Sequence, residues 1–204
     1  MKHSSGVPRA ALALAVALGC AGCGGSGAGR ESLQAASTPD PAGGESVYAL
    51  DIPLVDQDGR RLHLADLRGQ VRVAAMMYAS CKSVCPRVTQ DMKGIQEQLS
   101  GARRERVSFV LFSLDPERDD PAALRAFARD HGLDPARWRL YSLPEESVRD
   151  LAAVLGVRYR KEEGGEFAHS AMIFVLDSGG VVRYRQVGLN ADPSGLIAAM
   201  DRAR

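Results

Sequence analysis

The chain has 204 residues, of which 45% are hydrophobic and 25% are charged. Its 26 Lys and Arg residues nearly balance its 25 Asp and Glu residues, and the formal net charge is +1, so we expect neither a nucleic-acid partner nor a polybasic membrane patch. An ordinary apolar fraction and only four cysteines exclude the collagen-like, disordered and disulfide-dense classes. These values predict one globular domain of ordinary size.

The N-terminal segment has the pattern of an export signal. Lys2 and Arg9 precede residues 10–19, which carry no charged or polar side chain. About ten apolar residues are too few to span a bilayer, which needs roughly twenty, but they are typical of the central region of a signal peptide. We therefore predict that residues 1–23 are a signal peptide and that the protein is exported to the periplasm or to the outer face of the cytoplasmic membrane.

Two cysteines at the end of this segment resemble the lipobox of bacterial lipoproteins, in which the cysteine is lipidated and becomes the new N-terminus. Cys20 follows Gly19 and Cys23 follows Gly22, and either is a candidate for the lipid anchor that holds the protein at the membrane. Cleavage by ordinary signal peptidase is the alternative, and it exports the protein as well. Residues 24–45 are mostly Gly, Ser, Ala and Pro, which predicts a flexible tether.

Residues 46–204 alternate strand-like and helix-like patterns, which predicts an α/β domain. A β-hairpin is expected over residues 47–55 and 61–64, with its turn at Asp58-Gly59. Residues 71–78 then form a nearly continuous apolar run, which is typical of a strand buried on both faces.

The central part of the domain continues this alternation. A helix is expected to begin around Cys81 and Cys85. A second buried strand follows at residues 107–114, and Asp120-Pro121 has the pattern of a helix start, with Gly132 at the end of that helix. The apolar residues that recur at helical spacing in the first helix are Val84, Val88, Met92, Ile95 and Leu99.

The C-terminal part predicts one more helix, a hairpin and a last helix. Residues 144–155 form the helical pattern closed by Gly156, residues 171–176 and 181–187 flank a turn, and residues 193–203 are amphipathic. The order of these elements is that of a thioredoxin-like fold, a central mixed sheet with flanking helices, here with an added N-terminal β-hairpin.

Cys81 and Cys85 are the cysteines within the predicted domain, and they follow the first buried strand at the start of a helix. The helix N-terminus and the neighbouring Lys82 both favour thiolate. Four residues of regular helix separate the Cβ atoms by about 5–6 Å, whereas a disulfide needs about 3.5–4.5 Å. The spacing therefore leaves room for an ion between the sulfurs, although a structural disulfide is the alternative in an exported protein.

One histidine is expected beside these cysteines. His169 stands immediately before the strand at residues 171–176, and in a thioredoxin-like fold this junction lies against the cysteine-bearing turn. Two thiolates and an imidazole are ligands that suit copper and also zinc. The other candidates have simpler roles: we expect a leader position for His3, a solvent-facing strand position for His63, a helix-capping role for His131, and core packing for Met76, Met77 and Met92.

Three motifs together resemble the Sco/SenC family: the cysteine pair followed by Pro86, the Ser-Leu-Asp-Pro-Glu-Arg-Asp segment at residues 113–119, and Phe-Ala-His-Ser at residues 167–170. Those proteins are thioredoxin-fold copper-binding proteins that help assemble the copper site of cytochrome c oxidase. The resemblance implies Cys81, Cys85 and His169 as copper ligands. It also implies Asp115 as an ancillary ligand or second-sphere group, with a cap of the following turn as the alternative.

The chain departs from the family pattern at two positions near the cysteines. Lys82 stands where the family usually has proline, and Ala79 stands where it usually has threonine or a similar residue. Both departures leave the three ligands in place.

The resemblance implies a membrane-tethered copper chaperone that carries Cu(I) or Cu(II) to an oxidase subunit or another cuproprotein. The alternative is a thiol–disulfide oxidoreductase that reduces the target's cysteines before metallation and uses the same two sulfurs. A thiol peroxidase ranks last, because the residues before Cys81 lack the Pro and Thr of that family. His169 distinguishes the first two functions, since only copper binding requires it.

Overall fold

The structure is a computed structural model that describes residues 38–39 and 44–203. The predicted signal peptide, the candidate lipidation sites Cys20 and Cys23 and most of the predicted tether lie outside the described residues. In the part that is described, no helix is both long enough and apolar enough to cross a membrane. The described residues cover nearly all of the predicted domain.

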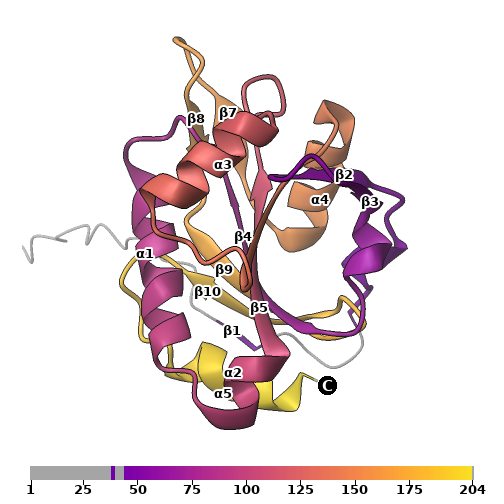
Figure 1. Cartoon of the computed structure of the whole chain (residues 1–204), viewed down its shortest axis with the longest axis vertical. Coiled ribbons are helices and arrows are strands. Elements are labelled where there is room, and N and C mark those ends of the chain that lie inside the picture. The colour runs from indigo at the N-terminus through magenta and orange to yellow at the C-terminus, as the bar shows by residue number, and fades with distance from the viewer. Residues whose placement is uncertain (1–37, 40–43, 204) are drawn as a thin grey trace, which may run out of the picture. The chain divides into compact units, whose positions relative to one another are not determined.

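A mixed sheet of eight strands, counted over the described residues, forms the centre of the domain (Figure 1). Side by side, its strands are β1 (Thr38–Pro39), β10 (Val182–Val187), β9 (Met172–Leu176), β4 (Val71–Met77), β5 (Val107–Ser113), β6 (Trp138–Ser142), β2 (Pro53–Asp56) and β3 (Arg61–His63). β4, β5 and β6 are parallel, and the strands on either side of them pair antiparallel. This arrangement confirms the predicted α/β class with a central mixed sheet.

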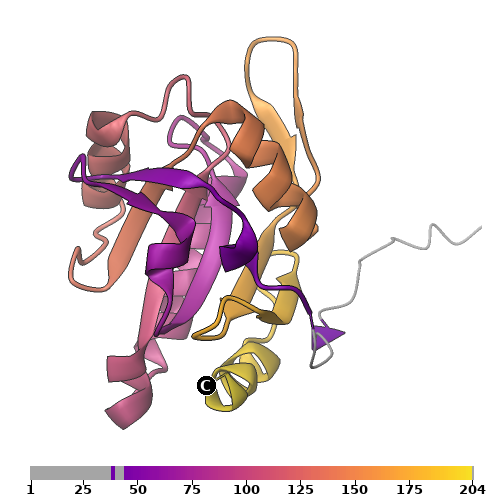
Figure 2. The ribbon, with the colours of Figure 1, turned by 90° about the vertical axis from the view of Figure 1, so that its right-hand side faces the viewer.

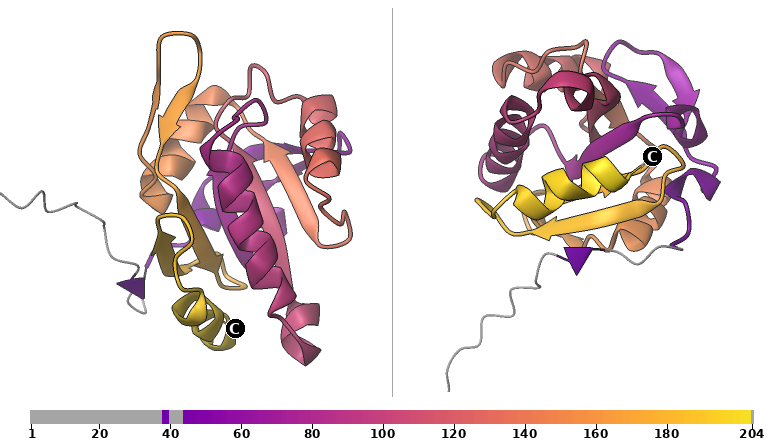
Figure 3. Two further views of the ribbon diagram at one scale, coloured as in Figure 1. Left: turned by 90° about the vertical axis from the view of Figure 1, so that its left-hand side faces the viewer. Right: turned by 90° about the horizontal axis from the view of Figure 1, so that it is seen from below.

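Helices cover both faces of the sheet. They are η1 (Val47–Ala49), η2 (Leu64–Leu67), α1 (Val84–Glu97), α2 (Gly101–Arg106), α3 (Pro121–Asp130), α4 (Glu145–Leu155) and α5 (Ser194–Arg202). In the left view of Figure 3, α1 lies in front of the sheet and α4 lies behind it, and Figure 2 shows α4 in front from the opposite side. A sheet covered on both faces needs strands that are apolar on both faces, which explains the nearly continuous apolar runs of β4 and β5.

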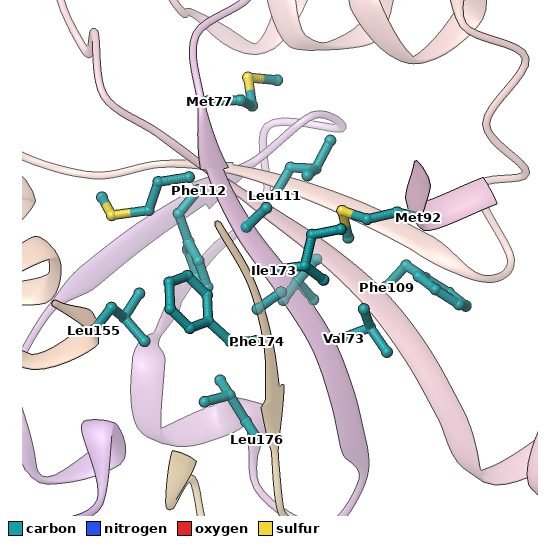
Figure 4. Close-up of a cluster of buried hydrophobic side chains, with 14 of the residues drawn as sticks. Val73, Met77, Met92, Phe109, Leu111, Phe112, Leu155, Ile173, Phe174 and Leu176 are labelled. Carbon is teal, nitrogen blue, oxygen red and sulfur yellow. The ribbon is translucent and has the colours of Figure 1, made fainter. Parts of the chain in front are cut away.

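The core consists of two layers of side chains, one on each face of the central strands (Figure 4). Val73 and its neighbour Phe109 lie on the face that α1 covers, and Phe112 and Phe174 lie on the face that α4 covers. All four side chains are completely buried. Burial of a large apolar side chain contributes about 1.5–3 kcal/mol, so these layers hold the central strands firmly in place.

The N-terminal hairpin is present but shorter than predicted. Residues 47–49 form η1, because the Ser46 hydroxyl accepts a hydrogen bond of 3.1 Å from the backbone N–H of Tyr48 and caps a helical turn. The first strand of the hairpin therefore begins only at Pro53. The predicted turn is confirmed, with Gly59 at a φ of 81°, a backbone conformation that favours glycine.

Several elements were not predicted from the sequence. β6 extends the parallel part of the sheet between β5 and the hairpin, and its buried residues are interrupted by the half-buried Arg139 instead of forming an apolar run. The short helix α2 was also missed. A separate two-stranded ribbon, which we call the β7–β8 ribbon, consists of β7 (Tyr159–Lys161) and β8 (Phe167–His169). It lies at the same end of the sheet as the start of α1 (Figures 1 and 3).

Candidate metal centre

The cysteine-bearing turn connects the end of β4 to the start of α1. The carboxylate of Asp119 accepts hydrogen bonds from the backbone N–H of Ala79 at 3.1 Å and from the Ser113 hydroxyl at 2.5 Å. The backbone N–H of Cys81 donates to the carbonyl oxygen of Tyr78 at 3.2 Å. Asp119 is buried, and burial raises its pKa to about 6. These bonds fix the turn between two strand ends.

The two thiols lie together beneath this turn. Cys81 and Cys85 are 5% and 0% exposed, and both are free. The backbone N–H of Cys85, in the first turn of α1, donates a hydrogen bond of 3.4 Å to Cys81 Sγ. The hydrogen bond between the two sulfurs lowers the pKa of Cys81 and raises the pKa of Cys85, and burial raises the latter further. The predicted thiolate at the helix start is therefore favoured at Cys81.

His169 completes the group from the β7–β8 ribbon. Its Nε2 lies 3.3 Å from Cys85 Sγ, and its Nδ1 lies 3.1 Å from the carbonyl oxygen of Ser170. A carbonyl oxygen can only accept, so Nδ1 carries the proton and the lone pair of Nε2 faces Cys85 Sγ, where it accepts the thiol proton or is available to a metal. The sulfur atoms of the two cysteines and a ring nitrogen of His169 all lie within 4.8 Å of one another.

This donor set fits a soft or borderline transition-metal ion. In zinc sites such donors lie about 2.0–2.3 Å from the metal, so two ligands of one ion are separated by at most about 4.6 Å. The observed separations of up to 4.8 Å need only a slight movement to reach that limit. Thiolate and imidazole ligands suit copper and zinc, whereas magnesium and calcium prefer oxygen.

The side of the site that faces solvent is formed by the β7–β8 ribbon. His169 is half-buried and lines an open groove of about 380 Å³ together with Arg158, Arg160 and Ser170. The cysteines, in contrast, are shielded from solvent. An incoming ligand therefore reaches the histidine side of the site more readily than the sulfur side.

Asp115 lies near this centre but is occupied by other contacts. Its carboxylate, 1% exposed, forms an ion pair with the Arg118 guanidinium, and it does not belong to the group of potential ligand atoms above. Its backbone carbonyl accepts from the N–H groups of Arg118 and Asp119, at 3.1 and 2.9 Å. These contacts show a role in the turn after β5, and its role as an ancillary ligand stays a prediction.

The structure also places the other residues considered from the sequence. His63 is exposed and pairs with Asp51, and His131 lies at the C-terminal end of α3 with Nδ1 2.9 Å from the carbonyl oxygen of Phe127. Both positions agree with the predictions. The methionines considered as soft ligands are in the core: Met76 is 3% exposed, Met77 is 1% exposed and Met92 is 0% exposed.

Sequence reasoning missed the residues that hold the ligands in position. Asp119 was considered only as the last residue of the motif at residues 113–119. Tyr78 was considered only as one of the residues before Cys81 that lack the Pro and Thr of thiol peroxidases. Tyr78 is buried, and its hydroxyl lies 2.8 Å from Glu166 Oε2 and 3.2 Å from the backbone nitrogen of Phe167. Burial raises the pKa of Tyr78, so its hydroxyl stays protonated. An adjacent Gly164-Gly165 pair between short alternating segments was the available signal for the ribbon.

Comparison with known proteins shows which family this sequence matches. The family model described as SCO1/SenC matches residues 43–203. The SCO1 protein homolog of Bacillus subtilis (strain 168) is 28% identical over 141 residues, which are 68% of this chain and 72% of the relative.

Solved structures show the same fold. A SCO1/SenC family lipoprotein from Bacillus anthracis str. Ames is 30% identical, with a TM-score of 0.67 over 76% of this chain and 94% of that one. ScoI from Bradyrhizobium japonicum with copper bound is 22% identical, with a TM-score of 0.62 over 75% of this chain and 97% of that one. The predicted thioredoxin-like fold is confirmed by these similarities, and because the family model spans most of its length, the chain belongs to the SCO1/SenC family.

Proposed function

We propose that this protein binds one copper ion through Cys81, Cys85 and His169 and passes it to a copper-requiring subunit of cytochrome c oxidase. The convergence of two sulfurs and one imidazole nitrogen within 4.8 Å carries the proposal. Membership of the SCO1/SenC family and the similarity to a copper-bound ScoI structure support copper as the metal. Thiolate ligands favour Cu(I), and both thiols must be reduced for binding.

Transfer of the ion follows from the two sides of the site. Three protein ligands leave room for a further one, and the groove beside His169 gives a ligand from the partner access to that side. We expect the partner to displace the imidazole first, because His169 is half-buried while both cysteines are enclosed. The sulfur atoms then release copper last, after the partner has supplied its own ligands.

We further propose that the domain is exported and held at the membrane by a lipid on Cys20 or Cys23. The charged start, the apolar run of about ten residues and the two Gly-Cys pairs support this proposal, as does the description of the similar Bacillus anthracis protein as a lipoprotein. Labelling of cells with an alkyne fatty acid tests it. We expect label on the full chain, and we expect one of the two variants, Cys20→Ala or Cys23→Ala, to lose it. A wild-type chain without label would contradict lipidation.

A competition titration with a chromogenic Cu(I) chelator tests the copper site. We expect one tightly bound copper per chain in the fully reduced protein. Affinity should fall by more than about a hundredfold in Cys81→Ser/Cys85→Ser and in His169→Ala, a larger loss than is usual for residues behind the ligands. His63→Ala is the matched control, because that exposed histidine lies on β3 in the hairpin. Binding that is indifferent to His169 would contradict the proposal.

Thiol–disulfide exchange is a second candidate, favoured by the unequal pKa values of the two thiols. The Cys81 thiolate would attack a disulfide of the target, releasing one target thiolate and forming a mixed disulfide. Cys85, after losing its proton, would then displace the second target sulfur, leaving a Cys81–Cys85 disulfide and a reduced target. Reductase activity that survives His169→Ala while copper affinity is lost would show that the protein performs this reaction independently of copper.

A further inference from the structure

The β7–β8 ribbon has little intrinsic stability, although it carries a metal ligand. β7 and β8 are three residues long, and they pair with each other and not with the main sheet. Isolated two-stranded ribbons are marginally stable in water. Nevertheless, His169 at the end of β8 reaches 3.3 Å from Cys85 Sγ. Contacts between side chains and the ribbon must therefore hold this histidine in place.

The Tyr78 hydroxyl makes the most direct of these contacts. Tyr78 follows β4 and is 2% exposed. Its hydroxyl donates to Glu166 Oε2 at 2.8 Å and accepts from the backbone N–H of Phe167 at 3.2 Å. Both partners belong to the ribbon, at or just before the start of β8 and within three residues of His169. One hydroxyl thus joins the cysteine-bearing end of β4 to the strand that carries the third ligand.

The ring of Tyr78 contacts the same strand. Its edge-to-face contacts have centroid separations of 5.4 Å to Phe167 and 6.0 Å to His169. A phenylalanine at position 78 would keep these ring contacts and would lose only the interactions of the hydroxyl, which are with Glu166, with Phe167 and with the Cys81 thiol. A substitution can therefore separate the effect of the hydroxyl from that of packing.

Arg118 holds the neighbouring turn in a similar way. Its guanidinium donates to the carbonyl oxygen of Gly165, and the buried carboxylate of Asp115 holds that guanidinium in an ion pair. Arg118 and Tyr78 therefore contact the same turn, Arg118 at Gly165 and Tyr78 at Glu166 and Phe167. The contact from Tyr78 is closer to His169 along the chain and comes from the turn that bears the cysteines.

We propose that Tyr78 is a positioning residue for His169, and that its hydroxyl sets the distance between the imidazole and the two sulfurs. The proposal rests on the proposed function, because it assigns Tyr78 a part in assembling the copper site. Without the hydroxyl, β8 loses its link to the end of β4, and His169 occupies its ligand position for a smaller fraction of the time. Copper affinity falls in proportion to that fraction.

Two variants that each remove one hydroxyl test the proposal. Tyr78→Phe removes the hydrogen bonds to Glu166 and Phe167. Tyr159→Phe is the matched control: it lies opposite His169 in the same ribbon, and its hydroxyl has no hydrogen-bond partner among the described residues. Copper affinity should fall about 10–100-fold in Tyr78→Phe, the range typical of residues behind a metal ligand, and should be unchanged in Tyr159→Phe.

Two further measurements distinguish positioning from a general loss of structure. In the metal-free protein, the backbone amides of Glu162 and Ser170, which are hydrogen-bonded within the ribbon, should exchange with solvent about tenfold faster in Tyr78→Phe. Amides of β4 and β5 should exchange as in the wild type. In the Cu(II)-loaded protein, the nitrogen hyperfine coupling of the imidazole should weaken in Tyr78→Phe only.

Glu166 provides a rescue experiment. Glu166→Gln keeps an acceptor for the Tyr78 hydroxyl and should retain most of the copper affinity, whereas Glu166→Ala should resemble Tyr78→Phe. Unchanged amide exchange in Tyr78→Phe, or equal effects in Tyr159→Phe, would overturn the proposal. A wild-type protein that binds no copper would refute the proposed function, while amide exchange in the metal-free protein would still decide whether Tyr78 positions the ribbon.

Discussion

The ligands of the candidate metal centre come from two regions that are built very differently. Cys81 and Cys85 follow β4, whose seven residues are all buried and are paired with β5 along their whole length. His169 ends β8, whose three residues pair with β7 and none of which is fully buried. The difference teaches that the core fixes the two candidate sulfur ligands, whereas a few polar contacts hold the candidate nitrogen ligand.

The core that supports β4 should be the most sensitive to substitution. Phe112 is completely buried and stacks on Tyr141 with a centroid separation of 5.8 Å. Phe112→Ala should lower the free energy of unfolding by about 3–5 kcal/mol, a large part of the 5–15 kcal/mol typical of a domain. Urea denaturation of the reduced protein measures this change. A loss below about 1 kcal/mol would show that the sheet is less tightly packed than described.

Asp119 should make the stability of the cysteine turn depend on pH. Burial raises its pKa from 3.8 to about 6, so the folded protein holds this proton more tightly than the unfolded chain does. The stabilising effect is complete below about pH 4 and is lost as the pH rises through 6, which amounts to about 3 kcal/mol. Asp119→Asn has no such proton to lose. From pH 4 to pH 7 the unfolding free energy of the wild type should therefore fall by about 3 kcal/mol relative to that of Asp119→Asn, and parallel profiles would contradict this assignment.

Phe167 allows the two regions to be separated by one substitution. It is partly buried on β8 and contacts the Tyr78 ring. Phe167→Ala should lower the free energy of unfolding by only about 1 kcal/mol, because little area is lost from the core, but it should weaken copper binding by about tenfold or more. Urea denaturation and chelator competition measure the two effects. A large loss of stability with normal copper binding would contradict this comparison, because it would show that the ribbon stabilises the fold and does not position His169.

A substitution at Gly156 should have a small effect on stability and none on copper binding. It ends α4 in the left-handed conformation with a φ of 75°, and an added Cβ would meet only Arg185 Nε, at 3.8 Å. Gly156→Ala should therefore cost about 1 kcal/mol of backbone strain without a clash. Copper affinity should be unchanged, since α4 carries none of the ligands. A parallel loss of affinity would mean that the metal centre is coupled to α4.

The parts of the fold that follow from local patterns were predictable. The apolar runs predicted β4 and β5, Asp120-Pro121 predicted the start of α3, and the cysteine spacing at a helix start predicted that the two sulfurs lie together. Each of these signals lies within about ten neighbouring residues, where periodicity and capping are visible.

The parts that depend on distant contacts were not predictable. The carboxylate of Asp119 binds a backbone N–H forty positions away, at Ala79, and the Tyr78 hydroxyl binds the N–H of Phe167 at an even larger separation. No local pattern reports such a contact. β6 was missed because Arg139 interrupts its apolar residues, and the β7–β8 ribbon was missed because its strands have only three residues each.

If one copper ion is held jointly by the core and by the ribbon, X-ray absorption spectroscopy of the Cu(I)-loaded protein will show this most directly. The wild type should show two sulfur scatterers and one imidazole nitrogen around copper. His169→Ala should lose the nitrogen and keep both sulfurs. A sulfur-only spectrum in the wild type, or an identical nitrogen contribution in His169→Ala, would contradict a site that joins Cys81 and Cys85 to His169.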